Sequence, residues 1–281
     1  MHDAANLSRA RVARTELFVR RVRRCCTGSG PVRALVLLAL CARVASAQPS
    51  ADLVMAGDRE SAARRPAQAL PLFERAVAAD PRNYTALWKA SRELVDLGEF
   101  EANATTRSGY YSRAMDYAKR AIAVNPNDAE GHFHLARAIG RTALSVGPKE
   151  RVKFGIEVRE QAMRALELAP RHPGALHVMG VWHAEIMRLG GLTRMVAKTF
   201  LGGKVFNTAS WAEATRYMEA SVAVEPLRLV HRLDLARVYR DSGRPSDARA
   251  AYQAAIGSPL TDPNDELYRS EATAELAKLR N

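Results

Sequence analysis

Cysteine is scarce in this chain and is confined to its beginning. Of the 281 residues only three are cysteines, and these are Cys25, Cys26 and Cys41. Downstream of Cys41 the sequence therefore excludes a disulfide framework and a thiol nucleophile.

The sequence also lacks the short motifs that mark common active sites. It contains no H-E-x-x-H, G-x-S-x-G, G-x-G-x-x-G or P-loop pattern. His132 and His134 are two residues apart, which turns them about 200° away from each other on a helix, so they cannot share a metal ion. We therefore expect a protein that is not an enzyme and has no catalytic residue, metal site or cofactor.

Long hydrophobic runs are missing as well. The apolar stretch Ala34–Leu40 is far shorter than the roughly 18 residues that span a bilayer. It follows an arginine-rich start and precedes Ala45-Ser46-Ala47, an order that is typical of a secretory signal peptide. We predict that residues 1–47 are removed after Ala47, and that residues 48–281 are exported, periplasmic or secreted, without a transmembrane segment. The long basic region leaves an organelle-targeting sequence as the alternative.

The positive charge of the chain comes mostly from this leader. The formal net charge is +12, but residues 1–47 hold nine arginines and two acidic residues, which leaves 33 basic and 28 acidic residues downstream. No basic run or RNA-binding motif occurs in that remainder. Nucleic acid is therefore not an expected partner.

What the sequence does contain is a repeated helical hairpin. Residues 235–255 follow the pattern L-A-x2-Y-x3-G-x4-A-x3-Y-x2-A, in which small residues let two helices approach and Gly243 allows the turn. This spacing resembles the tetratricopeptide repeat (TPR), a two-helix unit of about 34 residues. Such a unit cannot bury its apolar face alone, so further copies are expected.

The second half of the pattern occurs four more times, and each copy ends at a proline that stops a helix. The copies begin at Ala69, Ala114, Val158 and Ala214. We predict an all-α, TPR-like, right-handed superhelical solenoid of about five helical hairpins, with a capping helix from Asp265 to Arg280. An ordinary alanine-rich helical bundle is the alternative.

Three stretches depart from a plain repeat. Residues 98–109 and 147–150 are interpreted as insertions, the first of which delays the second helix of its hairpin until after Gly109. Residues 192–201 lie between two glycine pairs and can form a short amphipathic helix. We predict that this insert is a lid helix, with Arg194, Lys198 and Phe200 as its candidate site residues.

These departures, together with the repeats, resemble one known family. The relevant segments are Leu87-Trp88-Lys89-Ala90, residues 115–121, residues 177–182, residues 194–200 and the block from Trp211 to Met218. Over residues 84–280 the chain is similar to the regulator of microtubule dynamics family. The resemblance implies a TPR-like protein linked to microtubules and spindle poles, and one membrane-anchored member binds and transfers phospholipids. Microtubules are expected as a partner only if the chain is cytoplasmic.

The repeat register predicts which side chains form a binding groove. The fifth positions of the first helices are Val54, Trp88, Phe133, His177 and Leu233, and the ninth positions are Asp58, Arg92, Arg137, Val181 and Arg237. Positions i and i+4 share one helix face, so stacked repeats place the two sets in parallel rows. We predict a ligand-binding groove formed by Trp88, Arg92, Phe133, Arg137, His177, Leu233 and Arg237. The alternative is that each arginine pairs with a carboxylate of the next repeat and each aromatic residue serves packing.

Two functions remain open at this point. The first is a binding scaffold for a protein or peptide partner, including an acidic peptide, because arginines bind carboxylates. The second is a module that binds or transfers a lipid or another anionic amphiphile, such as a phospholipid or a fatty acid. An open charged groove favours the first function, and a closed apolar tunnel favours the second.

Overall fold

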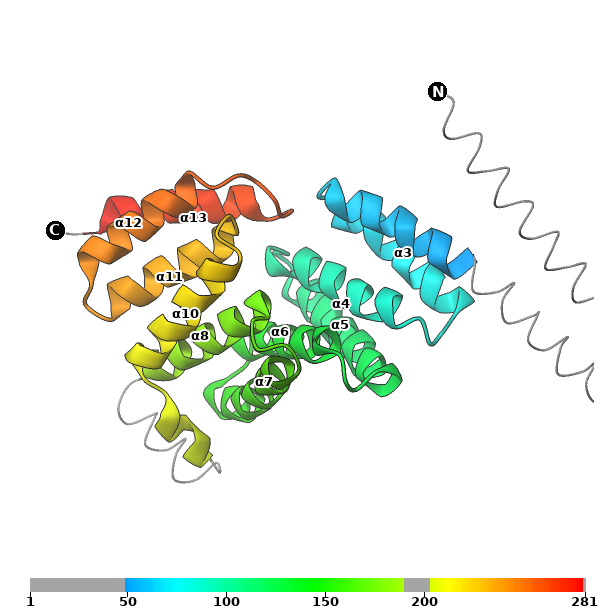
Figure 1. Cartoon of the computed structure of the whole chain (residues 1–281), viewed down its shortest axis with the longest axis horizontal. Helices are drawn as coiled ribbons and strands as arrows, with labels where there is room; N and C mark the ends of the chain where they lie inside the picture. The colour runs from blue at the N-terminus through cyan, green and yellow to red at the C-terminus, as the bar shows by residue number, and fades with distance from the viewer. Residues whose placement is uncertain (1–48, 190–202, 280–281) are drawn as a thin grey trace, which may run out of the picture. The chain divides into compact units, whose positions relative to one another are not determined.

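The described part of the chain is entirely helical. The computed structural model describes residues 49–189 and 203–279, which lie almost wholly within one compact unit that begins at Ser50. Every regular element in these residues is a helix, and none is a strand (Figure 1). The prediction of an all-α helical solenoid is confirmed.

The helices pair in chain order into five hairpins, as the repeat spacing predicts. In the first hairpin, residues 49–62 are followed by α3 (Pro66–Ala79). The next four hairpins are α4 (Tyr84–Glu99) with α5 (Ala104–Val124), α6 (Ala129–Leu144) with α7 (Pro148–Leu168), α8 (Pro173–Arg188) with α10 (Trp211–Val224), and α11 (Leu229–Asp241) with α12 (Pro245–Ile256). The last helix is α13 (Asp265–Lys278), close to the predicted bounds.

Small residues fill the space between paired helices, together with a large side chain in some hairpins. Ala69, Ala214 and Ala248 have no exposed surface, and neither do the larger Phe73 and Tyr252. Fully burying an apolar side chain of this size stabilises the fold by about 1.5–3 kcal/mol. Burial of the repeated second-helix positions thus holds each hairpin together.

Two of the glycines are required for different reasons, one by close packing and one by its backbone conformation. Gly57 packs so close to α3 that an added Cβ would lie 2.5 Å from the ring of Phe73. Gly243 has φ of +80°, in the left-handed region that side chains with a Cβ rarely adopt. Gly243 therefore makes the turn of the fifth hairpin, as predicted.

The long second helices correct one prediction. α5 begins at Ala104, where the side chain of Asn103 accepts hydrogen bonds from the amides of Thr105 and Thr106. The helix runs through Gly109 instead of starting after it, so the predicted delay is wrong. α5 and α7 have 21 residues each and α3 has 14, so the extra residues extend the helices.

The fourth hairpin contains a serine helix cap. The Ser210 side chain accepts a hydrogen bond from the Glu213 amide at 3.1 Å and starts α10. A short 3-10 helix, η1 (Gly203–Thr208), precedes it and buries Phe206 against Trp182. The predicted lid, including Arg194, Lys198 and Phe200, lies outside the described residues.

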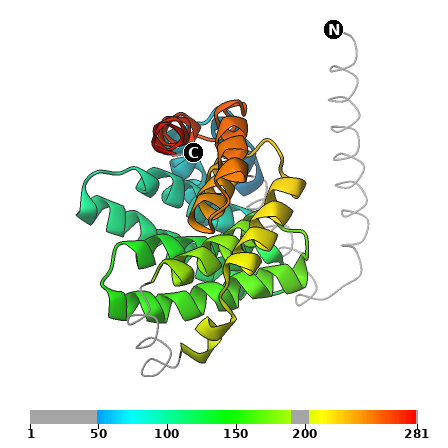
Figure 2. The same cartoon turned by 90° about the vertical axis from the view of Figure 1, so that its left-hand side faces the viewer.

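α13 covers the end of the fifth hairpin. Its Tyr268 and Ala272 are buried in a cluster with Leu229, Leu233 and Tyr252 of α11 and α12, and α13 lies beside both helices in Figures 1 and 2. In the described residues, no helix is long and apolar enough to cross a membrane.

Candidate functional site

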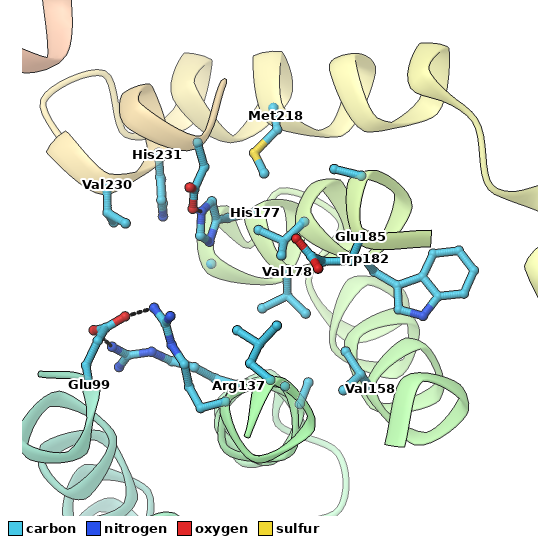
Figure 3. A pocket seen from close by; sticks show the side chains of 18 of the residues that line it. Glu99, Arg137, Val158, His177, Val178, Trp182, Glu185, Met218, Val230 and His231 are labelled. Carbon is cyan, nitrogen blue, oxygen red and sulfur yellow. Dashed lines mark hydrogen bonds and ion pairs between the residues drawn. The ribbon is translucent and has the colours of Figure 1, made fainter. Parts of the chain in front are cut away.

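A cavity of about 1210 Å³ lies between the first helices of the hairpins and the C-terminal part of the chain (Figure 3). One side is the inner wall, which we define as the lining side chains of α4, α6, α8 and α11. The opposite side is the C-terminal segment, which we define as residues 262–275. The cavity is therefore bounded by elements from four hairpins and from α13.

The C-terminal segment reaches the second hairpin through a few polar and aromatic contacts. The Asn264 side chain donates to the Asp96 carbonyl at 3.0 Å, and Arg141 donates to the Tyr268 hydroxyl at 3.4 Å. The Tyr268 ring meets Phe100 edge to face, with ring centroids 5.3 Å apart. These contacts join α4 and α6 to the C-terminal segment at the border of the cavity.

The structure brings six of the seven predicted groove residues to this cavity. Each of the six belongs to the inner wall, and they are Trp88, Arg92, Phe133, Arg137, His177 and Arg237. Leu233 does not line the cavity, because it is fully buried in the cluster beneath α13. Among the other row positions, Val181 lines the cavity, Val54 is buried in the core, and Asp58 pairs with Lys89 at 2.6 Å.

The row of arginines is neutralised from within the chain. Arg92 donates to Glu93 at 2.7 Å and to Ser61 at 3.0 Å. Arg137 contacts Asp96 at 2.6 Å and Glu99 at 3.6 Å. The partners of Arg92 and Arg137 thus come from the same helix and from the preceding repeat, and not from the next repeat as the alternative interpretation held.

Arg237 holds three carboxylates. Its guanidinium group lies 3.0 Å from Asp234 of its own helix, 2.7 Å from Glu271 and 2.5 Å from Glu275 of α13. The last two contacts tie α13 to the inner wall. An anionic ligand at Arg237 must therefore compete with carboxylates that are already bound there.

Aromatic and imidazole rings connect α4, α6 and the start of α8. Trp88 stacks on His134, with ring centroids 5.2 Å apart and planes at 9°. Phe133 lies against His134 and His172 at 4.7 and 4.6 Å. Burial lowers the pKa of His134 to about 4, so this ring is neutral at pH 7.

A second imidazole group joins α8 to α11. The His177 ring lies 2.8 Å from a carboxylate oxygen of Asp234 and stacks on His231 at 4.5 Å. His231 contacts Ser221 at 3.0 Å, and burial holds the pKa of His231 well below its usual range. His177 and His231 appear side by side at the same edge of the cavity in Figure 3.

One part of the cavity is lined mainly by apolar groups. Its lining includes Ala136 and Gly140 of α6, Val158 of α7, and Val178 and Trp182 of α8. The Trp182 indole N–H donates to the Gly155 carbonyl at 2.7 Å, which fixes the ring against α7. In Figure 3, Val158 and Trp182 lie on the opposite side of the view from Glu99 and His231.

Sequence reasoning missed much of this lining. Gly140, Arg141 and Leu144 continue the inner face of α6 at helical spacing beyond Arg137, so extending the i, i+3, i+4, i+7 stripe by two turns would have found them. No comparable sequence pattern predicted that the C-terminal segment lines the cavity. In the described residues, no group of three or more His, Cys, Asp or Glu side chains is placed to hold a metal ion.

Comparison with known proteins places the chain in a family. The family model described as regulator of microtubule dynamics protein 1-3 matches residues 50–280, which is most of the sequence. The chain belongs to this regulator of microtubule dynamics family. The resemblance expected from the sequence is confirmed.

Relatives in the regulator of microtubule dynamics family are distant. Regulator of microtubule dynamics protein 3 of Rattus norvegicus is 22% identical over 185 residues, which cover 66% of this chain and 39% of that protein. Protein 1 of Mus musculus is 24% identical over 195 residues, which cover 69% of this chain and 63% of that protein. The chain thus spans well under two thirds of the length of several relatives it matches.

Solved structures support the repeat fold. A thermophilic TPR protein of Thermus thermophilus superposes with a TM-score of 0.58 at 21% identity, covering 80% of this chain and 99% of that chain. At this identity the likeness shows the fold alone. This member of the regulator of microtubule dynamics family is therefore a TPR-like helical-repeat protein.

Proposed function

We propose that this chain is a non-enzymatic binding scaffold that takes a short segment of a protein partner into the cavity between the inner wall and the C-terminal segment. The observation that carries the proposal is the cavity itself. Its volume of about 1210 Å³ exceeds the roughly 300–1,000 Å³ that is common for small-molecule sites. The family and the fold support a helical-repeat scaffold for protein interaction.

The lining suits a peptide because it contains both polar and apolar groups. Pairs such as Arg137 with Asp96 and His177 with Asp234 offer both donors and acceptors at the wall. Trp88 and Phe133 supply aromatic surface beside them. Since the arginines already hold carboxylates, we expect selectivity to depend on shape and apolar contacts more than on net negative charge.

Selection of random peptides on the immobilised full chain tests this function. We expect selected peptides to change the fluorescence of Trp88 or Trp182, which line the cavity, on binding. Peptides whose binding leaves both tryptophans unaffected, or the absence of any selected peptide, would contradict the proposal.

The second candidate is an amphiphile-binding module, and the apolar part of the cavity lining favours it. Apolar side chains of α6, α7 and α8 lie at one end, and Arg137, Arg141 and Arg237 lie along the charged lining. A fatty acid or phospholipid has matching apolar and anionic parts. Native mass spectrometry of the purified chain separates the candidates, because a co-purified lipid adds a discrete mass and an empty chain does not.

Microtubule binding is not part of this proposal. The sequence predicts a signal peptide over residues 1–47, and a chain exported by it would not meet tubulin. If the chain keeps its first residues and stays in a cytoplasm, tubulin becomes a partner to examine.

A further inference from the structure

The apolar end of the cavity contains a recess beside the C-terminal half of α6. Gly140 is a helical residue in this element, and a Cβ built on it would meet nothing closer than Cγ2 of Val158, at 3.9 Å. A glycine within a helix costs about 1 kcal/mol relative to alanine. Helix stability therefore gives no reason for glycine at this position, and packing leaves space where a side chain could be.

The recess has apolar walls. Ala136 and Gly140 of α6 form one wall. Val158 of α7 forms the second wall, and Val178 and Trp182 of α8 form the third. Behind Trp182 lies Phe206, which is 1% exposed and has its ring centroid 5.7 Å from the Trp182 ring. Trp182 and Phe206 thus form a packed aromatic wall on the α8 side of the recess.

Paired polar groups stand around the entrance to the recess. Glu185 pairs with Arg188 at 2.6 Å on α8, and Arg137 pairs with Asp96 on the side toward α4. Both pairs line the cavity. An apolar group that enters the recess is thus flanked by donors and acceptors, as the side chain of a peptide is flanked by its own backbone.

We infer that this recess is a specificity pocket that takes one large aliphatic or aromatic side chain of the bound peptide, such as Leu, Met or Phe. The inference rests on the proposed function and names the group that the cavity recognises. A single side chain matches the recess because its apolar walls are bordered by paired polar groups that can meet a peptide backbone. The absence of a side chain at Gly140 provides the room.

The test fills the recess from within. Gly140→Leu adds an apolar side chain at the open position, and Gly109→Leu is the matched control. Gly109 is also a helical residue with nothing within 4 Å of a built Cβ, but it lies on α5 and does not line the cavity. Because leucine is a better helix former than glycine, we expect neither variant to have a lower thermal midpoint than the parent.

A small probe reports access to the recess independently of any partner. With Trp88 and Trp211 replaced by Phe, Trp182 is the remaining tryptophan of three, and 8-bromooctanol quenches indole fluorescence on contact. We expect saturable quenching in the parent and in Gly109→Leu, and about ten-fold weaker or absent saturation in Gly140→Leu. Equal saturation in both leucine variants would show that the recess is not where the probe binds and would overturn the inference.

Selected peptides then identify the occupant. We expect the selected peptides to share one Leu, Met or Phe. Replacing that residue with Ala, or introducing Gly140→Leu into the protein, should each lower the affinity about ten-fold or more. Combining the two changes should cause no further loss. Peptides that bind Gly140→Leu as tightly as the parent would refute the pocket while leaving the proposed function intact. Saturable quenching without any selected peptide would refute both the peptide occupant and the proposed function, and would leave a hydrocarbon ligand.

Discussion

Replacing Arg137 tests whether the arginine row is built into the fold or reserved for a ligand. Its side chain is 18% exposed, and the two carboxylates it contacts, Asp96 and Glu99, are 12% and 3% exposed. Arg137→Met keeps most of the aliphatic packing but leaves Asp96 without this cation, whereas Glu99 still pairs with Arg141. Removing one partner of a buried ion pair costs about 3–5 kcal/mol, so we expect a loss of about that size.

Urea denaturation followed by far-ultraviolet circular dichroism measures this loss. If it arises from the stranded Asp96 carboxylate, the double variant Arg137→Met with Asp96→Asn should recover most of it. Arg216→Met is the control, because Arg216 is 56% exposed and pairs with Glu213 of the same helix; we expect a change below about 1 kcal/mol. A loss below about 1 kcal/mol for Arg137→Met would refute the structural role and would favour a ligand-binding role for the arginine row.

Three further predictions concern titration, packing and processing. The buried His134 has a pKa of about 4, below that of the unfolded chain, so its neutral form contributes stability above pH 6.5 that is lost on acidification. From pH 7.5 to 5 the free energy of unfolding of the parent should fall by about 2 kcal/mol more than that of His134→Gln. An equal fall in the two proteins would contradict this. Gly57→Ala should destabilise the fold by about 1–3 kcal/mol because its Cβ would meet the Phe73 ring at 2.5 Å. Gly109→Ala has open space around its Cβ and should stabilise the fold by about 1 kcal/mol. The thermal midpoints measure both effects, and equal midpoints would refute the packing argument. N-terminal sequencing of material from the native source should start at Gln48, and a chain that begins at Met1 would contradict the signal-peptide prediction.

The fold was predictable from sequence because its signals are local and repeated. The offset of Ala248 from Tyr252 recurs in each second helix, and each copy supports the others. The same periodicity located Trp88 and Arg137 on the inner wall. Helix capping was the weak point, since Asn103 at the start of α5 turned an expected loop into extra helical turns.

The cavity itself could not be read from the sequence. Its far side depends on Asn264 and Tyr268 meeting Asp96 and Arg141, across 168 and 127 residues of chain. Such contacts depend on the accumulated geometry of all the intervening hairpins, and a repeat pattern gives no measure of that geometry. The burial of Leu233 has the same origin, because α13 covers a position that would otherwise continue the row.

Site-specific photocrosslinking in the native source tests the central claim, that the cavity is the binding site, most directly. A photoreactive residue at Val178, which lines the cavity, is compared with one at Lys119, an exposed residue of α5 that does not line it. The account predicts that Val178 forms crosslinks to one short stretch of one partner protein and that Lys119 does not, with the Val178 crosslink lost in Gly140→Leu. Crosslinks to the same partner from Lys119 alone would contradict the account.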